Sequence, residues 1–261
     1  MTTLTHAAAD SATMLRRNLR HALRYPSLTI AGMMTPILIM LLFVGVFGNA
    51  LGDGVGGAAS GDYINYVAPG IILMAVASGC MTTSVSVSMD LTEGIVDRFR
   101  TMPIARASLL TGHVVGSMIQ TMVSTAAVIG VAVAMGFRTD GGLLDWLAAI
   151  GLLALLMFGL TWVAVALGLL AKNPEGASNT PLIIQFLPFL GSAIVPPESM
   201  PAGVRWFAEY QPFTPIIETL RGLLVGSPSG SDAAASVAWC VGLAVVGYVC
   251  SKVLFNRKAP R

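Results

Sequence analysis

The chain has 261 residues, of which 55% are hydrophobic and only 11% are charged, and its formal net charge is +2. A soluble domain carries about 25% charged residues, so this composition argues against a soluble protein and favours one that lies in a membrane. The three cysteines fall within apolar runs and indicate neither a disulfide framework nor a redox compartment.

The first predicted element is a basic amphipathic helix over residues 10–25. Leucines recur there at every fourth position, and arginines follow the same spacing on a neighbouring face before Pro26 ends the helix. The arginines are Arg16, Arg17, Arg20 and Arg24. We expect this helix to lie in the cytoplasmic membrane interface, with its arginines towards lipid phosphates. A simple topology anchor is the alternative explanation.

Six apolar segments are then long enough to cross a bilayer, whose core of about 30 Å needs about 20 apolar residues in a helix. They cover residues 28–48, 64–89, 109–136, 146–171, 177–195 and 233–252. The first is too long for the apolar part of a signal peptide, so we expect it to be retained as a span. Because the connections are short, the sequence predicts one all-α membrane domain over residues 1–261 with six transmembrane helices.

The basic residues are distributed unevenly between the two sides of this predicted domain. Twelve of the 15 lysines and arginines fall on the side that holds both termini. By the positive-inside rule, both termini are expected in the cytoplasm.

The connection between the second and third predicted spans is a short charged segment. Residues 91–104 place acidic and basic side chains on one helical face and apolar side chains on another, and Pro103 ends the pattern. Its acids and bases balance, whereas a topology signal needs only lysine and arginine. We therefore expect a cytoplasmic amphipathic helix that docks on a partner protein rather than on lipid.

The last outer connection, residues 196–232, is long and rich in proline and aromatic residues. Apolar side chains fall on one helical face of it: Ile216, Ile217, Leu220, Leu223 and Leu224. We expect a re-entrant lid, partly embedded in the membrane between spans five and six. An ordinary surface loop is the alternative.

Several kinds of chemistry have no support in the sequence. It contains no phosphate-binding loop, so the chain is not expected to hydrolyse ATP alone. No zinc-hydrolase motif or Cys/His cluster with metal-ligand spacing occurs, and neither an enzyme nor a metal site is predicted. The middle of each apolar segment holds only neutral polar side chains, which argues against an ion-driven transporter. Most of these are expected to form hydrogen bonds between helices.

Two groups of residues resemble the type 2 ABC transporter permeases, especially the daunorubicin-resistance group of drug and lipid exporters. The first group is Glu93, Gly94, Arg98, Met102, Pro103, Ile104 and Arg106. The second is Pro197, Met200, Pro201, Trp206, the run from Gln211 to Pro215 that includes Pro212, and then Glu218 and Arg221. Gln211 departs from the asparagine more usual in that family. The resemblance covers nearly the whole chain.

The resemblance implies that residues 91–104 form a coupling helix, to which Asp97 and Arg100 also belong, seated on a separate ABC ATP-binding subunit. Two copies of that subunit would bind ATP and Mg²⁺, and this chain would hold no cofactor. A second permease, of the same or a related chain, would face this one across the substrate path. The candidate contacts on that path are Asn65, Ser78, Gln185, Phe186 and Phe189.

The sequence therefore predicts the permease subunit of an ATP-driven exporter of hydrophobic or amphipathic molecules, such as drugs, antibiotics or lipids. We expect it in a bacterial cell membrane, in contact with lipid and with no nucleic-acid partner. A secondary transporter or channel that works without ATP is the alternative, and a structural membrane subunit is a third possibility.

Overall fold

The computed structural model describes residues 26–48, 60–93, 106–226 and 230–257. Within these ranges the chain forms eight α-helices and no β-strand. The predicted helix over residues 10–25 lies outside the described residues, as does most of the predicted helix over residues 91–104. The all-α fold class is confirmed for the described part of the chain.

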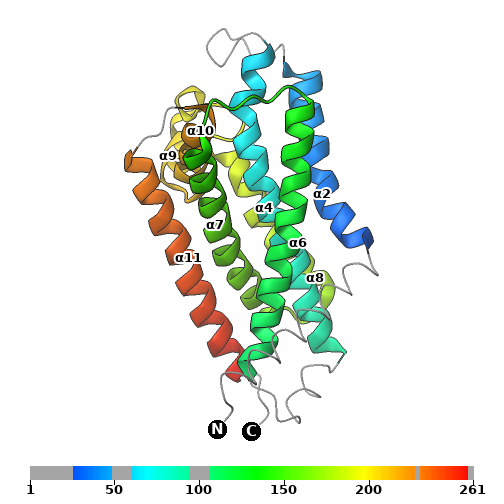
Figure 1. Cartoon of the computed structure of the whole chain (residues 1–261). Helices are drawn as coiled ribbons and strands as arrows, with labels where there is room; N and C mark the ends of the chain where they lie inside the picture. The colour runs from blue at the N-terminus through cyan, green and yellow to red at the C-terminus, as the bar shows by residue number, and fades with distance from the viewer. Residues whose placement is uncertain (1–25, 49–59, 94–105, 227–229, 258–261) are drawn as a thin grey trace.

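Six helices run side by side and make up most of the molecule (Figure 1). They are α2 (Pro26–Met40), α4 (Ser60–Thr92), α6 (Arg106–Ala134), α7 (Leu143–Leu170), α8 (Pro174–Phe186) and α11 (Gly230–Arg257). Helix α2 continues as the π-helix η1 (Leu41–Val46), and α8 continues as the 3-10 helix η3 (Leu187–Leu190). Three short helices precede α11, namely η4 (Pro197–Ser199), α9 (Ala202–Tyr210) and α10 (Phe213–Val225).

Four helices in the described ranges are long and apolar enough to cross a membrane. Their apolar segments are Tyr63–Thr92, Thr111–Ala134, Leu143–Leu170 and Asp232–Arg257, which correspond to the second, third, fourth and sixth predicted spans. The first and fifth predicted spans are also helical but shorter. Helix α8 has 13 residues, or about 20 Å at 1.5 Å per residue. The structure thus supports a helical chain that can cross a membrane several times. The full set of six crossings stays a prediction.

Helix α4 forms the centre of the bundle and contacts α2, α6, α7, α8 and α10. Nearly every side chain between Tyr63 and Ala77 is buried. The sequence of α4 explains this position, because its first half is almost continuously apolar and can pack on all sides.

Small residues bring α7 and α11 together along most of their length. A Cβ atom on Gly159 of α7 would lie 2.9 Å from the carbonyl oxygen of Cys240, and one on Gly247 of α11 would lie 2.6 Å from the backbone nitrogen of Val163. Glycine at these positions lets the backbones approach closely, as is common between membrane helices. The other face of α11 exposes a row of valines: Val237, Val241, Val245 and Val249.

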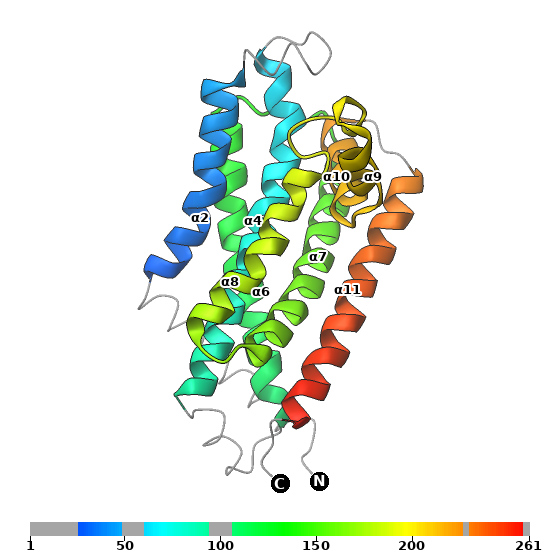
Figure 2. The same ribbon diagram turned by 180° about the vertical axis from the view of Figure 1, so that it is seen from behind.

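The segment with α9 and α10 lies at the end of the bundle opposite the end of α4 and the start of α6 (Figure 2). Helix α10 buries Phe213, Ile216, Ile217, Leu220 and Leu224 against α4, α7 and α11. It ends at Gly226, whose φ of 95° is in the left-handed region that favours glycine. The predicted apolar face therefore packs into the bundle, unlike an ordinary surface loop, while its depth in a membrane stays a prediction.

Candidate functional site

A buried pair of ionisable side chains joins the ends of α4 and α6. Asp90 is 8% exposed in the last turn of α4, and His113 is 4% exposed near the start of α6. The Nε2 atom of His113 lies 2.9 Å from Oδ2 of Asp90. Because an ionised carboxylate only accepts hydrogen bonds, Nε2 carries the hydrogen when Asp90 is charged. The pair links the two helices that flank residues 91–104.

Only the edges of the predicted coupling segment lie within the described residues. Glu93 is exposed directly after α4, and its backbone N–H donates to the carbonyl oxygen of Met89 at 2.9 Å. Arg106 is the first residue of α6. The following predicted contacts lie outside the described residues: Gly94, Asp97, Arg98, Arg100, Met102, Pro103, Ile104, Arg16, Arg17, Arg20 and Arg24.

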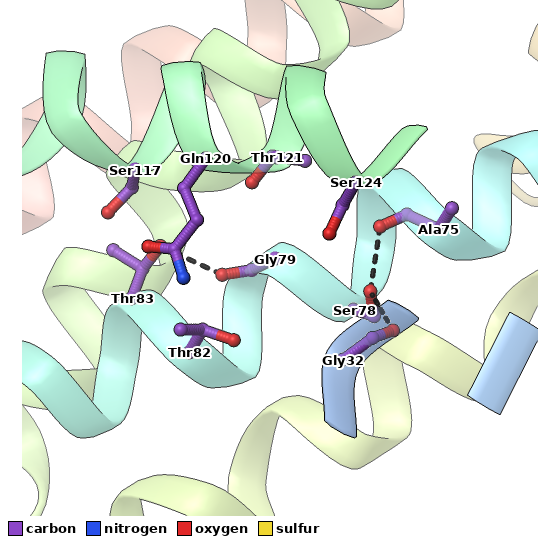
Figure 3. A pocket seen from close by; sticks show the side chains of 10 residues that line it. All are labelled: Gly32, Ala75, Ser78, Gly79, Thr82, Thr83, Ser117, Gln120, Thr121 and Ser124. Carbon is purple, nitrogen blue, oxygen red and sulfur yellow. Dashed lines mark hydrogen bonds between the residues drawn. The ribbon is translucent and has the colours of Figure 1, made fainter. Parts of the chain in front are cut away.

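A polar niche lies between α2, α4 and α6, away from both ends of the bundle (Figure 3). It is a small space that is partly open to the surroundings. The residues that line it are Gly32, Ala75, Ser78, Gly79, Thr82, Thr83, Ser117, Gln120, Thr121 and Ser124. All of them are uncharged, so the niche offers hydrogen bonds without a net charge.

Two of the hydroxyl groups in the polar niche donate hydrogen bonds to backbone carbonyl oxygens. Ser78 Oγ lies 2.7 Å from the carbonyl oxygen of Ala75 and 3.2 Å from that of Gly32, and Thr83 Oγ1 donates to Gly79 at 2.8 Å. Figure 3 shows the hydroxyls of Thr82, Ser117, Thr121 and Ser124 around the same space, without a hydrogen bond to another residue of the niche. These four groups can therefore bind water or a polar group that enters from outside.

The other four predicted path residues lie elsewhere. Asn65 accepts a hydrogen bond from the backbone N–H of Arg138 at 3.0 Å, and so ties α4 to the connection between α6 and α7. Gln185 is buried on α8. Phe186 and Phe189 are ring neighbours at the end of α8, with centroids 5.9 Å apart. The predicted path residues thus fall into separate regions of the described structure.

A row of phenylalanines connects η1 with the end of α8. The ring centroid of Phe189 is 6.4 Å from that of Phe43, which is 6.1 Å from that of Phe47. Together with Phe186 these rings form the aromatic row, and two of them, Phe47 and Phe186, are exposed. Such a surface can contact lipid, a second protein or an aromatic cargo.

Arg221 holds the segment with α9 and α10 to the bundle. Its Nη2 donates to the carbonyl oxygens of Ser192 at 2.7 Å and Tyr66 at 3.1 Å, and its Nη1 donates to Glu218 at 2.6 Å. The guanidinium carbon also lies 3.8 Å from the centre of the Tyr66 ring. One side chain of α10 thereby binds α4 and the chain that follows η3, as the planar fork of arginine allows.

The remaining predicted lid residues lie near Arg221 in sequence but serve different parts of the segment. Pro197 is buried in η4, and Pro201 precedes α9. Trp206 is 65% exposed on α9, with its ring centroid 5.6 Å from that of Tyr210. The other residues of this group are Met200 before α9, Pro212 before α10 and Pro215 within α10. An exposed Trp–Tyr pair is typical of a membrane–water interface.

Sequence patterns missed the Asp90–His113 pair and the partners in the aromatic row. Asp90 lies one residue beyond the predicted second span, and His113 is 23 residues further along the chain. A local signal existed, because an acid in the last turn of a helix opposes the helix dipole. Phe43 and Phe47 share one face of the first span, but only the structure shows which helix they meet.

Long apolar helices with uncharged polar groups between them indicate a multi-pass membrane protein. A family model described as ABC-2 type transporter matches residues 11–225, so the chain belongs to that family. It is 29% identical over 255 residues to the daunorubicin resistance ABC transporter permease protein DrrB1 of Streptomyces coeruleorubidus, covering 97% of this chain and 88% of the relative.

A second similarity links the chain to mycobacterial proteins. It is 27% identical over 181 residues to the probable doxorubicin resistance ABC transporter permease protein DrrC of Mycobacterium tuberculosis, covering 68% of this chain and 66% of the relative. The resemblance predicted from the two sequence motifs is thus confirmed at the level of the family.

Proposed function

We propose that the chain is the permease subunit of an ATP-driven exporter of hydrophobic or amphipathic molecules, powered by a separate ATP-binding subunit. The observation that carries the proposal is the family match over residues 11–225, joined by relatives named as drug-resistance permeases. The sequence contains no phosphate-binding loop of its own, which fits a division of labour between permease and ATPase.

In this proposal ATP and Mg²⁺ are bound by two copies of the partner subunit, at the cytoplasmic face of a bacterial cell membrane. Residues 91–104 dock on that subunit, with Glu93, Asp97 and Arg98 among the contacts. The basic helix over residues 10–25 touches the same subunit. The positions of α4 and α6 support this arrangement. Residues 91–104 connect the two helices in sequence, and the helices contact each other in the bundle.

Two permeases, of the same or a related chain, are proposed to enclose the substrate path. The polar niche and the aromatic row suit a weakly polar, amphipathic cargo, because one offers uncharged hydrogen-bonding groups and the other offers rings. Drugs, antibiotics and lipids share this character. The names of the relatives make daunorubicin the first probe to test.

One observation favours the alternative, a secondary transporter that needs no ATP. Ionisable residues inside membrane helices are the usual elements of ion-driven transport, and Asp90 with His113 forms a buried pair of this kind. The pair lies at the end of α4 rather than at its middle, which is a better place for coupling to residues 91–104 than for a relay across the bundle.

Reconstitution into liposomes distinguishes these functions. We expect export of daunorubicin only when both the ATP-binding subunit and ATP are present. Glu93→Ala and Arg98→Ala should leave the permease folded on size-exclusion chromatography and lower ATP-driven export at least tenfold, because docking contacts with the ATP-binding subunit are lost. Export by the chain alone, or export at the normal rate by both variants, contradicts the proposal.

The polar niche is tested by removing one hydroxyl without changing shape. Thr121→Val should lower daunorubicin export by about fivefold, the equivalent of one hydrogen bond worth about 1 kcal/mol. Thr161→Val is the matched control, because the Thr161 hydroxyl donates to Met157 within α7 and lies outside the niche. Equal export rates for the two variants would show that the niche does not contribute to the substrate path.

A further inference from the structure

The Asp90–His113 pair has a position that ordinary helix stability does not explain. Asp90 places a carboxylate near the negative C-terminal end of the α4 dipole, and His113 lies in the N-terminal part of α6. The position of Asp90 is the less favourable one for a carboxylate. Both side chains are also buried, and a buried charge without a partner is strongly destabilising. Their mutual contact gives each of them a hydrogen-bonded partner on the other helix.

An apolar cluster includes sequence neighbours of both members of the pair. Val87 and Val114 flank it in sequence and belong to an apolar cluster with Trp162, Leu169 and Phe255, which come from α7 and α11. In such a nonpolar environment a hydrogen bond is stronger than in water. The pair therefore links α4 to α6 next to the point where both helices pack on the rest of the bundle.

We propose that Asp90 and His113 are positioning residues, and we call their contact the clasp. The clasp fixes the ends of α4 and α6 to each other, so that a movement of residues 91–104 displaces both helices together. The inference rests on the proposed function, because it assumes that an ATP-binding subunit moves residues 91–104. Without the clasp, the same movement would bend the end of only one helix and would not displace the other.

A double substitution separates this role from a merely structural one. Asp90→Leu with His113→Leu removes both members of the pair at once, a type of replacement that is often neutral or stabilising for folding. His113→Gln retains a donor in place of Nε2. The exchange Asp90→His with His113→Asp restores a pair in the reverse order. Asp140→Asn, at an exposed site in the connection between α6 and α7, is the control.

The readout is movement at the opposite end of the bundle, and it does not depend on the identity of the cargo. An environment-sensitive fluorophore is attached at Val46→Cys, which is 68% exposed at the end of η1, in a background with Cys250→Ser. The complex with the ATP-binding subunit is reconstituted, and ATP hydrolysis and the fluorescence change on ATP addition are measured on the same sample.

We expect the double leucine variant to hydrolyse ATP while its fluorescence change falls at least fivefold. His113→Gln and the exchanged pair should retain at least a third of the normal change, and Asp140→Asn all of it. A normal change in the double leucine variant overturns the clasp, and so does an exchanged pair that does not recover. If the unmodified complex neither hydrolyses ATP nor responds to it, the proposed function itself fails.

Discussion

Replacement of Arg221 with leucine is expected to lower the free energy of unfolding by about 3 kcal/mol or more. The side chain is only 14% exposed and makes an ion pair with Glu218, hydrogen bonds to two backbone carbonyls and a stacking contact with Tyr66. Leucine removes all of these and leaves the carbonyl oxygens of Tyr66 and Ser192 without their donor. The segment with α9 and α10 should then detach from α4.

Thermal unfolding in detergent measures the loss of stability, and limited proteolysis of the segment with α9 and α10 measures its detachment. Arg205→Leu is the matched control, because Arg205 forms an ion pair with Glu209 on α9 while its side chain is 46% exposed. Exposed pairs of this type contribute little to stability. Arg221→Lys should fall between the two, since lysine retains the charge but not the planar fork. Equal stability of the leucine variants at both positions would show that Arg221 is not the attachment.

The helical architecture could be predicted from the sequence because a lipid bilayer restricts the secondary structure that a chain can adopt. A backbone in a bilayer must satisfy its hydrogen bonds internally, so a long apolar run is a helix. Four of the six runs appear as helices of sufficient length. The fifth run is different, because α8 ends at Phe186 and continues as the 3-10 helix η3, in which Pro188 lacks a backbone donor. Hydropathy alone does not reveal such an interruption.

The candidate site could be predicted only in part, because hydropathy does not fix the rotation of a helix about its axis. Ser78 was expected on the substrate path, and it does line the polar niche. Gln120 and Ser124 line it too, although the sequence predicted only helix–helix hydrogen bonds for such residues. Asn65 was also expected on the path, yet its side chain accepts a bond from the Arg138 backbone. Which side chains meet across helices depends on packing that one sequence does not specify.

Gly247→Leu is expected to separate α7 from α11 and to lower the free energy of unfolding by about 3 kcal/mol, near the upper end of the usual cost of overpacking. Even a Cβ atom at this position would lie 2.6 Å from the backbone nitrogen of Val163 and 2.9 Å from Cβ of Trp162. Backbone atoms cannot move aside as a flexible side chain can, so α11 must shift. The shift would also strain the bond from Ser251 Oγ to the Trp162 carbonyl oxygen, now 3.0 Å.

Gly242→Leu provides the matched control on the same helix. A Cβ atom at Gly242 would meet nothing within 4 Å, and leucine has a higher helix propensity than glycine. The two substitutions make the same chemical change five residues apart, so they differ only in which face of α11 they alter. We expect a lower melting temperature for the Gly247 variant and an unchanged or slightly higher one for the Gly242 variant. If both variants melt at the same temperature, close glycine packing is not what holds α11 against α7.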